Sequence, residues 1–145
     1  MSTEIQRPFL IVVEGKDDKA VVELLLRYLG VDSVEVLEAG GKDNIQYLVE
    51  DLGKLAGFRH ILKGIAIVRD ADSNEEAARQ SCERILAGVD KRTQFYVLPG
   101  SGVGILEDLC LRALVERPEL QCVASYMDCL NLAGVVLTNP SKFRM

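Results

Sequence analysis

FLIVVEGKDD, at residues 9–18, is the stretch that decides the fold class of this chain. Its first five residues are apolar and mostly β-branched, which is typical of a strand buried on both faces. The run ends at Glu14-Gly15, and residues 16–29 then show helical spacing of apolar side chains. We expect this helix to end at Gly30 and to place one stripe in the core, formed by Val21, Leu24, Leu25 and Tyr28.

The same alternation of short apolar runs and amphipathic segments continues along the chain. Further strands are predicted at residues 33–37, 64–68 and 94–98, and helices at 44–55, 73–86, 105–115 and 118–134. Residues 134–138 (GVVLT) fit either a short fifth strand or a buried tail. Strands alternating with helices predict an α/β fold with a mostly parallel, four- to five-stranded sheet and helices on both faces. A length of 145 residues predicts a single domain over 1–145.

The start of the helix predicted at 73–86 carries a capping signature. Ser73-Asn74-Glu75-Glu76 puts a hydroxyl at the position that caps a helix and a carboxylate three residues later. We therefore expect Ser73 to cap the helix while Glu76 reaches back to the Ser73 backbone, and the helix to run to about Leu86.

The lengths of the apolar runs argue against a membrane protein and a secreted protein. No stretch approaches the ~18 apolar residues that a membrane helix needs, and the first apolar run is too short for a signal peptide. We therefore expect a cytoplasmic protein with no membrane contact.

The four cysteines are Cys82, Cys110, Cys122 and Cys129. They form no C-x-x-C pair and have no neighbouring histidine, which argues against a zinc site. We therefore expect free, buried thiols.

The charge balance limits nucleic-acid binding. The net charge is −5 and the pI about 4.9. Non-specific binding of nucleic acid depends on Lys and Arg that neutralise phosphates, so this is not the expected main role. A nuclease stays possible in charge terms, because bound metal ions reverse the sign of an acidic site.

Acidic side chains follow two of the predicted strands. Glu14 ends the first strand, and Asp70 and Asp72 follow the strand at 64–68. The carboxyl ends of parallel strands share one edge of the sheet, where ligands bind. If the strand continues, Asp70 and Asp72 point to the same side, and Asp18 lies one helical turn beyond Glu14.

Carboxylates gathered at one edge repel one another, by about 4 kcal/mol for two charges 4 Å apart at an effective dielectric near 20. Such a cluster shares a proton or binds a cation. Oxygen ligands select hard ions such as Mg²⁺, Mn²⁺ or Ca²⁺. The alternative is that Asp70 and Asp72 cap a loop and that Glu14 faces solvent. Two strand ends with acids at a similar height favour the metal site.

Two segments resemble a known domain. Glu14-Gly15-Lys16-Asp17-Asp18 and Asp70-Ala71-Asp72 resemble the E-G-x-x-D and D-x-D signatures of the toprim domain found in topoisomerases, primases and OLD-type nucleases. Residues 104–108 (GILED) resemble the acidic motif after the fourth strand in the OLD-type branch and in small uncharacterised bacterial toprim-like proteins. The likeness extends from Phe9 to Leu111.

This resemblance implies a toprim-like, Rossmann-like fold and a site for one or two Mg²⁺ or Mn²⁺ ions. Glu14 would be a metal ligand or the general acid/base, and the other implied metal ligands are Asp18, Asp70, Asp72 and Glu107. OLD-type enzymes also use a lysine after the acidic motifs, and Lys142 is the candidate here.

Two residues are predicted to bind substrate. Lys16 belongs to the E-G-x-x-D segment, and Ser101 lies in the loop PGSGVG at residues 99–104. That loop either cradles a phosphate through its backbone N–H groups or is a flexible turn.

Two functions remain open. The first is metal-dependent phosphodiester hydrolysis or phosphoryl transfer on DNA, RNA or a nucleotide. The second is a non-catalytic toprim-like module that binds metal or ligand. The sequence contains no G-x-x-x-x-G-K-[ST] loop and no room for the other domains of topoisomerases or primases. A protein that supplies a missing domain and a second copy of the chain are therefore both candidate partners.

Two other α/β classes fit less well. A receiver domain of two-component signalling usually has adjacent acids at the end of its first strand, where this chain has Glu14-Gly15. Haloacid-dehalogenase-type phosphatases place D-x-D after the first strand, whereas Asp70 comes after two strand–helix units.

Overall fold

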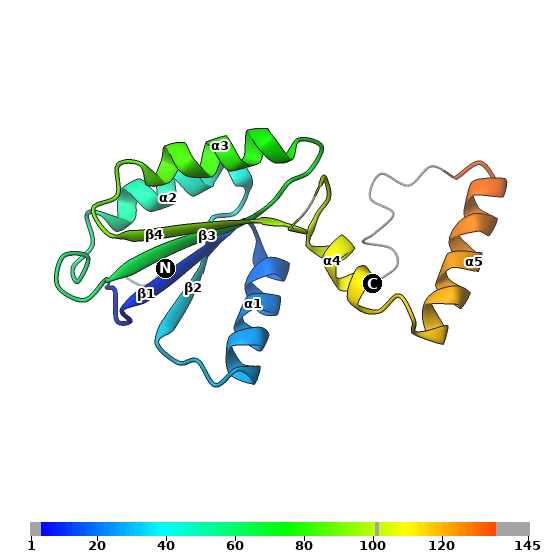
Figure 1. The fold of residues 1–145 in the computed structure, drawn as a ribbon, viewed down its shortest axis with the longest axis horizontal. Helices are drawn as coiled ribbons and strands as arrows, with labels where there is room; N and C mark the ends of the chain where they lie inside the picture. The colour runs from blue at the N-terminus through cyan, green and yellow to red at the C-terminus, as the bar shows by residue number, and fades with distance from the viewer. Residues whose placement is uncertain (1–3, 101, 136–145) are drawn as a thin grey trace.

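A computed structural model of the chain describes residues 4–100 and 102–135 (Figure 1). The four strands of the described residues are all parallel, in the order β2-β1-β3-β4. The predicted α/β fold with a mostly parallel sheet is therefore confirmed. The strands are β1 (Phe9–Val13), β2 (Val34–Glu38), β3 (Gly64–Asp70) and β4 (Arg92–Leu98). Residues 136–138 of the predicted fifth strand lie outside the described residues.

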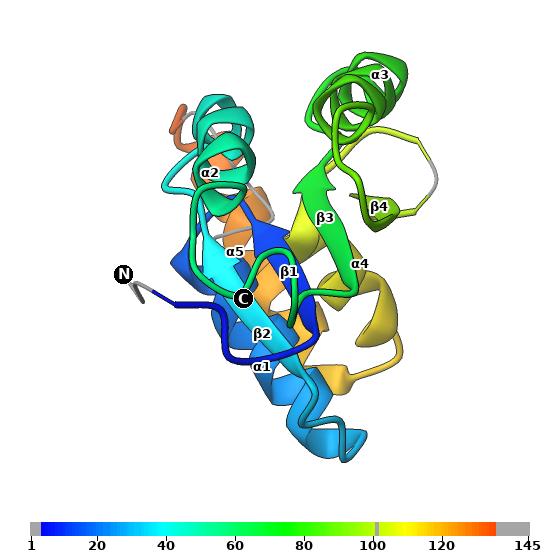
Figure 2. The same cartoon turned by 90° about the vertical axis from the view of Figure 1, so that its left-hand side faces the viewer.

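Helices lie on both faces of the sheet, as predicted. Helices α2 and α3 cover one face and α1 covers the other, while α4 and α5 extend beyond the carboxyl end of β4 (Figures 1 and 2). The helices are α1 (Lys16–Tyr28), α2 (Ile45–Leu52), α3 (Glu75–Leu86), α4 (Leu106–Ala113) and α5 (Pro118–Leu132), with a short 3-10 turn at Lys42–Asn44. None of the helices in the described residues is long and apolar enough to cross a membrane.

The core lies between the sheet and helices α2 and α3. Strand periodicity sends alternate residues of β1 and β3 to this face, and there they are almost completely buried. They are Leu10, Val12, Ile65 and Ile67, which pack with Ile45, Leu48, Val49, Leu52, Cys82 and Leu86 from the helices. The hydrophobic pattern of β1 and β3 thus explains why these two strands form the centre of the sheet.

Three of the four side chains that were expected to bury one stripe of α1 are exposed, and the fourth, Val21, is half-buried. No side chain of α1 is buried, and Leu24, Leu25 and Tyr28 are 63%, 53% and 86% exposed. The reason is that α1 is the one helix of the described residues that covers this face of the sheet. The half-buried apolar side chains of α1 are Val21, Val22 and Leu26, so the apolar arc of the helix is wider than its contact with the sheet.

The cysteines are only partly as expected. All four are free, as predicted, and Cys82 is buried in the core. Cys122 and Cys129 are exposed, so the expectation of buried thiols is wrong for them. Both lie on α5, which extends away from the sheet (Figure 1).

Asn74, and not Ser73, caps α3. The helix begins at Glu75, and the Asn74 side-chain oxygen accepts a hydrogen bond from the Ala77 backbone N–H at 3.0 Å. The capping prediction was therefore wrong by one residue, because the chain reaches extended geometry at Asn74 (φ −148°).

Replacing Asn74 with Ala should lower the free energy of unfolding by about 1 kcal/mol, because the Ala77 N–H loses its acceptor. Ser73→Ala is the matched control and should change stability by less than about 0.5 kcal/mol. Urea denaturation measures both. A larger loss in Ser73→Ala than in Asn74→Ala would contradict this assignment of the cap.

Candidate functional site

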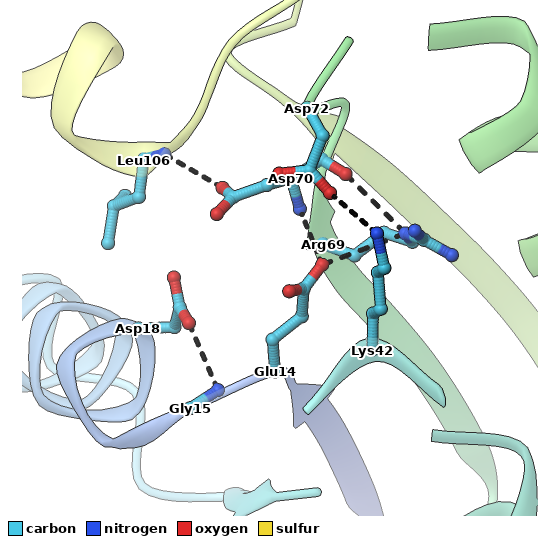
Figure 3. A network of polar contacts seen from close by, with 8 residues as sticks. All are labelled: Glu14, Gly15, Asp18, Lys42, Arg69, Asp70, Asp72 and Leu106. Carbon is cyan, nitrogen blue, oxygen red and sulfur yellow. Dashed lines mark hydrogen bonds and ion pairs between the residues drawn. The ribbon is translucent and has the colours of Figure 1, made fainter. Parts of the chain in front are cut away.

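The register of the sheet brings Glu14 beside the end of β3. Val13 pairs with Val68 across the two central strands, so the residues that follow reach the same edge together. The Asp70 backbone N–H donates a hydrogen bond of 3.1 Å to Glu14 Oε1. Figure 3 shows both carboxylates at this edge. The first two acids of the predicted cluster are therefore neighbours.

Asp18 joins the cluster from the first turn of α1. Its Oδ2 accepts a hydrogen bond of 3.0 Å from the Gly15 backbone N–H, and its carboxylate lies on the side of α1 that faces Asp70 (Figure 3). The start of α4 is built in the same way, because Asp108 Oδ2 accepts from the Ile105 N–H at 2.8 Å. In both helices a carboxylate in the first turn satisfies a backbone donor that would otherwise lack a partner.

Asp70 connects the sheet to α4. Its Oδ1 accepts a hydrogen bond of 2.7 Å from the Leu106 backbone N–H, at the first residue of that helix. The N-terminus of a helix carries partial positive charge and stabilises an anion. Asp70 is therefore in contact both with Glu14, through its backbone, and with α4, through its side chain.

Asp72 is placed by a local change of backbone direction. The strand ends at Asp70, and Asp72 has φ +53°, in the left-handed region. Asp72 and Gly104 exchange two backbone hydrogen bonds of 2.8 Å. The prediction that Asp70 and Asp72 point to the same side required the strand to continue through Asp72. The strand ends at Asp70, so this requirement is not met. Gly104 is required here, because a Cβ at its φ of +143° would lie 2.7 Å from Asp108 Oδ2.

Two cationic side chains that sequence reasoning missed complete the cluster. Arg69 Nε lies 3.7 Å from Glu14 Oε1, and Lys42 Nζ lies 3.5 Å from Asp72 Oδ2. The sequence could have indicated a partner for Arg69. This residue comes two positions after Ile67, so it falls on the buried face of β3, where an unpaired charge would be costly. Lys42 gave a weaker signal: it lies in the Gly40-Gly41-Lys42 turn after β2, at the same edge of the sheet.

A cavity of about 640 Å³ opens beside Asp72. Its walls come from α4, α5 and the loop before α4. They are mostly apolar, with the polar groups Asp72, Asp108, Arg112 and Gln121 among them. This volume is within the range of small-molecule sites, and it borders the acidic cluster.

Comparison with known protein families identifies the family of this chain. Residues 8–135 match the family described as "Protein of unknown function (DUF3226)". The chain belongs to the DUF3226 family. No curated protein and no solved structure matches it. The matched span contains the whole acidic cluster and both cations of this DUF3226 chain.

The central carboxylate of this DUF3226 site holds a proton far more strongly than an ordinary aspartate. The pKa of Asp70 is raised from 3.8 to about 7, first by burial and then by the negative charges of Asp18 and Glu14. The hydrogen bond from the Leu106 N–H lowers this pKa but does not offset the other effects. Asp70 therefore titrates near neutral pH.

Glu14 shows the same tendency. Its pKa is raised by burial, and the charges of Asp72 and Asp18 add to the increase. The hydrogen bond from the Asp70 N–H and the Arg69 guanidinium oppose it. The cluster thus brings several carboxylates close together, and in the described residues two cations contact it, Arg69 at Glu14 and Lys42 at Asp72.

The donors fit a hard divalent cation in chemistry. All are carboxylate oxygens, the ligands that such ions prefer. In residues 4–100 and 102–135, however, no three or more His, Cys, Asp or Glu side chains converge so as to hold an ion. Each acid instead has one oxygen on another partner: Glu14 on Asp70 N–H, Asp18 on Gly15 N–H, Asp70 on Leu106 N–H and Asp72 on Lys42.

The remaining predicted residues of the DUF3226 site are placed as follows. Lys16 is the first residue of α1 and is exposed. Glu107 follows Leu106 in the first turn of α4 and is 9% exposed, and its role as a metal ligand stays a prediction. Ser101 and Lys142 lie outside the described residues, so their predicted roles in substrate binding and catalysis stay predictions too.

Proposed function

We propose that the protein binds one or two Mg²⁺ or Mn²⁺ ions at the carboxyl edge of its sheet and uses them in phosphodiester hydrolysis or phosphoryl transfer on nucleic acid or a nucleotide. One observation carries this proposal. Carboxylates that follow β1 and β3 and one in the first turn of α1 lie at the same edge of the sheet (Figure 3). The resemblance of the segments that contain Glu14, Asp70 and Asp72 to the toprim signatures supports the same function.

Metal binding and proton transfer would be carried out by different residues of the site. Asp70 and Asp72 would hold one ion, and Asp18 and Glu107 would hold a second. A bound ion supplies charge stabilisation to the attacking and leaving oxygens of a phosphoester. Glu14 is suited to accept a proton from water, because burial raises its pKa and makes the carboxylate a stronger base.

Arg69 and the Asp70 N–H position Glu14. Both lie on Glu14 Oε1, at 3.7 Å and 3.1 Å. They restrict rotation of the carboxylate and leave Glu14 Oε2 as the oxygen for proton transfer.

Calorimetric titration of Mn²⁺ into the protein at pH 7.5 tests the site. We expect wild type to bind and Asp70→Asn to lose at least about tenfold in affinity, because one charged ligand and its share of the negative potential are gone. Asp90→Asn is the matched control: the same change is made just before β4, at the opposite end of the strand, in an exposed residue. Its affinity should equal that of wild type.

The outcomes separate the candidate functions. Mn²⁺ binding together with Mn²⁺-dependent cleavage of single- or double-stranded DNA, lost in Glu14→Gln, would support the enzyme. Binding without cleavage of DNA, RNA or nucleotides would support the non-catalytic module. Absence of Mn²⁺ binding to wild type, or equal binding in Asp70→Asn, would contradict the proposed site.

A further inference from the structure

We propose that Lys42 is an anion-binding residue, held by Asp72 in the metal-free protein and released to the phosphoryl group of a substrate when a divalent ion takes its place. This inference rests on the function proposed above and adds to it a phosphate subsite and an order of binding, metal before anion. It begins from the contact between Lys42 Nζ and Asp72 Oδ2, 3.5 Å apart (Figure 3).

The backbone of the loop holds Lys42 at the site. The Gly41 N–H donates a hydrogen bond of 2.9 Å to the Glu14 carbonyl oxygen, and Asn44 Nδ2 donates one of 3.1 Å to the Gly40 carbonyl oxygen. Gly40 and Gly41 have φ values of +76° and +132°, which residues other than glycine rarely adopt. The loop therefore keeps its place at the cluster whether or not Lys42 contacts Asp72.

The contact with Asp72 is easily exchanged. The side chains of Lys42 and Asp72 are 51% and 40% exposed, and ion pairs of this kind contribute little to stability. Arg69 differs, because its side chain is only 10% exposed and is paired with Glu14. A divalent ion at Asp72 would compete with the Lys42 ammonium and leave Arg69 in place.

A displaced Lys42 would still lie at the edge of the site. A flexible ammonium with three donors is well suited to a phosphate oxygen. The cavity of about 640 Å³ beside Asp72 leaves room for the rest of a phosphorylated ligand. Lys42 does not line this cavity but contacts Asp72, which does, so an anion bound beside Asp72 would lie within reach of the Lys42 ammonium.

Two affinities measured on Lys42→Gln test the inference, because they should change in opposite directions. Mn²⁺ should bind the variant about three- to tenfold tighter than wild type, since the competing ammonium is gone. Inorganic phosphate, titrated into the Mg²⁺-saturated protein, should bind about tenfold more weakly. Lys42→Arg should keep phosphate binding within about threefold of wild type, because the charge and donors remain.

Lys54→Gln is the control for loss of one surface charge. Lys54 pairs with Asp51 at the end of α2, and its substitution should change neither affinity. Unchanged or weaker Mn²⁺ binding in Lys42→Gln would overturn the inference, and so would unchanged phosphate binding, or no phosphate binding by Mg²⁺-saturated wild type. Each of these requires wild type to bind metal; wild type that binds no Mn²⁺ would overturn the proposed function itself.

Discussion

Asp70→Asn should make the metal-free protein more stable at pH 8.5, although it removes the central acid of the site. Asp70 is pushed to a pKa of about 7 by burial and by Asp18 and Glu14, so its ionised form is costly in the folded state. Asparagine removes the charge and keeps an oxygen that can accept from the Leu106 N–H. A shift of about three pKa units corresponds to about 4 kcal/mol, and partial solvent exposure reduces the expected gain to about 1–3 kcal/mol.

The gain depends on pH in a defined direction. In the unfolded chain Asp70 loses its proton near pH 3.8, whereas in the folded protein it keeps it to about pH 7. Wild type therefore loses stability as the pH rises between these values, and the full cost is present above pH 7. The advantage of Asp70→Asn should be near its maximum at pH 8.5, about half as large at pH 5.5, and absent below pH 3.8.

Thermal unfolding in the presence of a chelator measures this effect. At pH 8.5 the Tm of Asp70→Asn should exceed that of wild type by roughly 5 °C. Asp90→Asn, remote from the cluster, should show no such gain. Adding Mn²⁺ should raise the Tm of wild type more than that of Asp70→Asn, because only wild type keeps the full ligand set. A Tm of Asp70→Asn below that of wild type at pH 8.5 would contradict the strain assigned to this carboxylate.

Arg69→Met should have the opposite effect and lower the free energy of unfolding by about 3 kcal/mol at pH 7.5. Arg69 is 9% exposed and lies on the core side of β3. Its guanidinium lowers the pKa of Glu14 and is 3.7 Å from it. Methionine fills much of the same volume but leaves Glu14 half-buried without its cation, and breaking such a pair costs about 3–5 kcal/mol when fully buried.

A double-mutant cycle identifies the source of this loss. If the uncompensated Glu14 charge causes it, Arg69→Met with Glu14→Gln should be more stable than Arg69→Met alone by about 1–2 kcal/mol. Arg84→Met, on the exposed side of α3, is the control and should cost less than about 0.5 kcal/mol. Strictly additive losses in urea denaturation would mean that Arg69 acts through packing and not through Glu14.

Local sequence was sufficient for most of the fold. The runs at 9–13 and 64–68 are apolar at every position, so no other element could bury them as well as a central parallel strand. The helices near 16–28, 75–86 and 118–132 followed from periodicity and glycine or proline boundaries. The exposed stripe of α1 was not predictable, because its burial depends on how much of the sheet face other helices cover.

The acids of the candidate site were also within reach of sequence reasoning. Glu14, Asp70 and Asp72 follow strands, and parallel strands of an α/β sheet end at one edge. Chain connectivity therefore determined that these residues meet there. It also placed Asp18, since α1 begins two residues after Glu14 and Asp18 lies in its first turn.

What only the tertiary structure decided is how these charges are balanced. The pairing of Arg69 with Glu14 and of Lys42 with Asp72 joins residues 55 and 30 positions apart in the chain (69 − 14 and 72 − 42), and the Asp70–Leu106 bond joins residues 36 apart. Periodicity describes a single element and contains no distance between side chains on different ones. The raised pKa of Asp70 depends on such distances and on burial, so it emerges only when the strands, the loop at Lys42 and α4 are assembled.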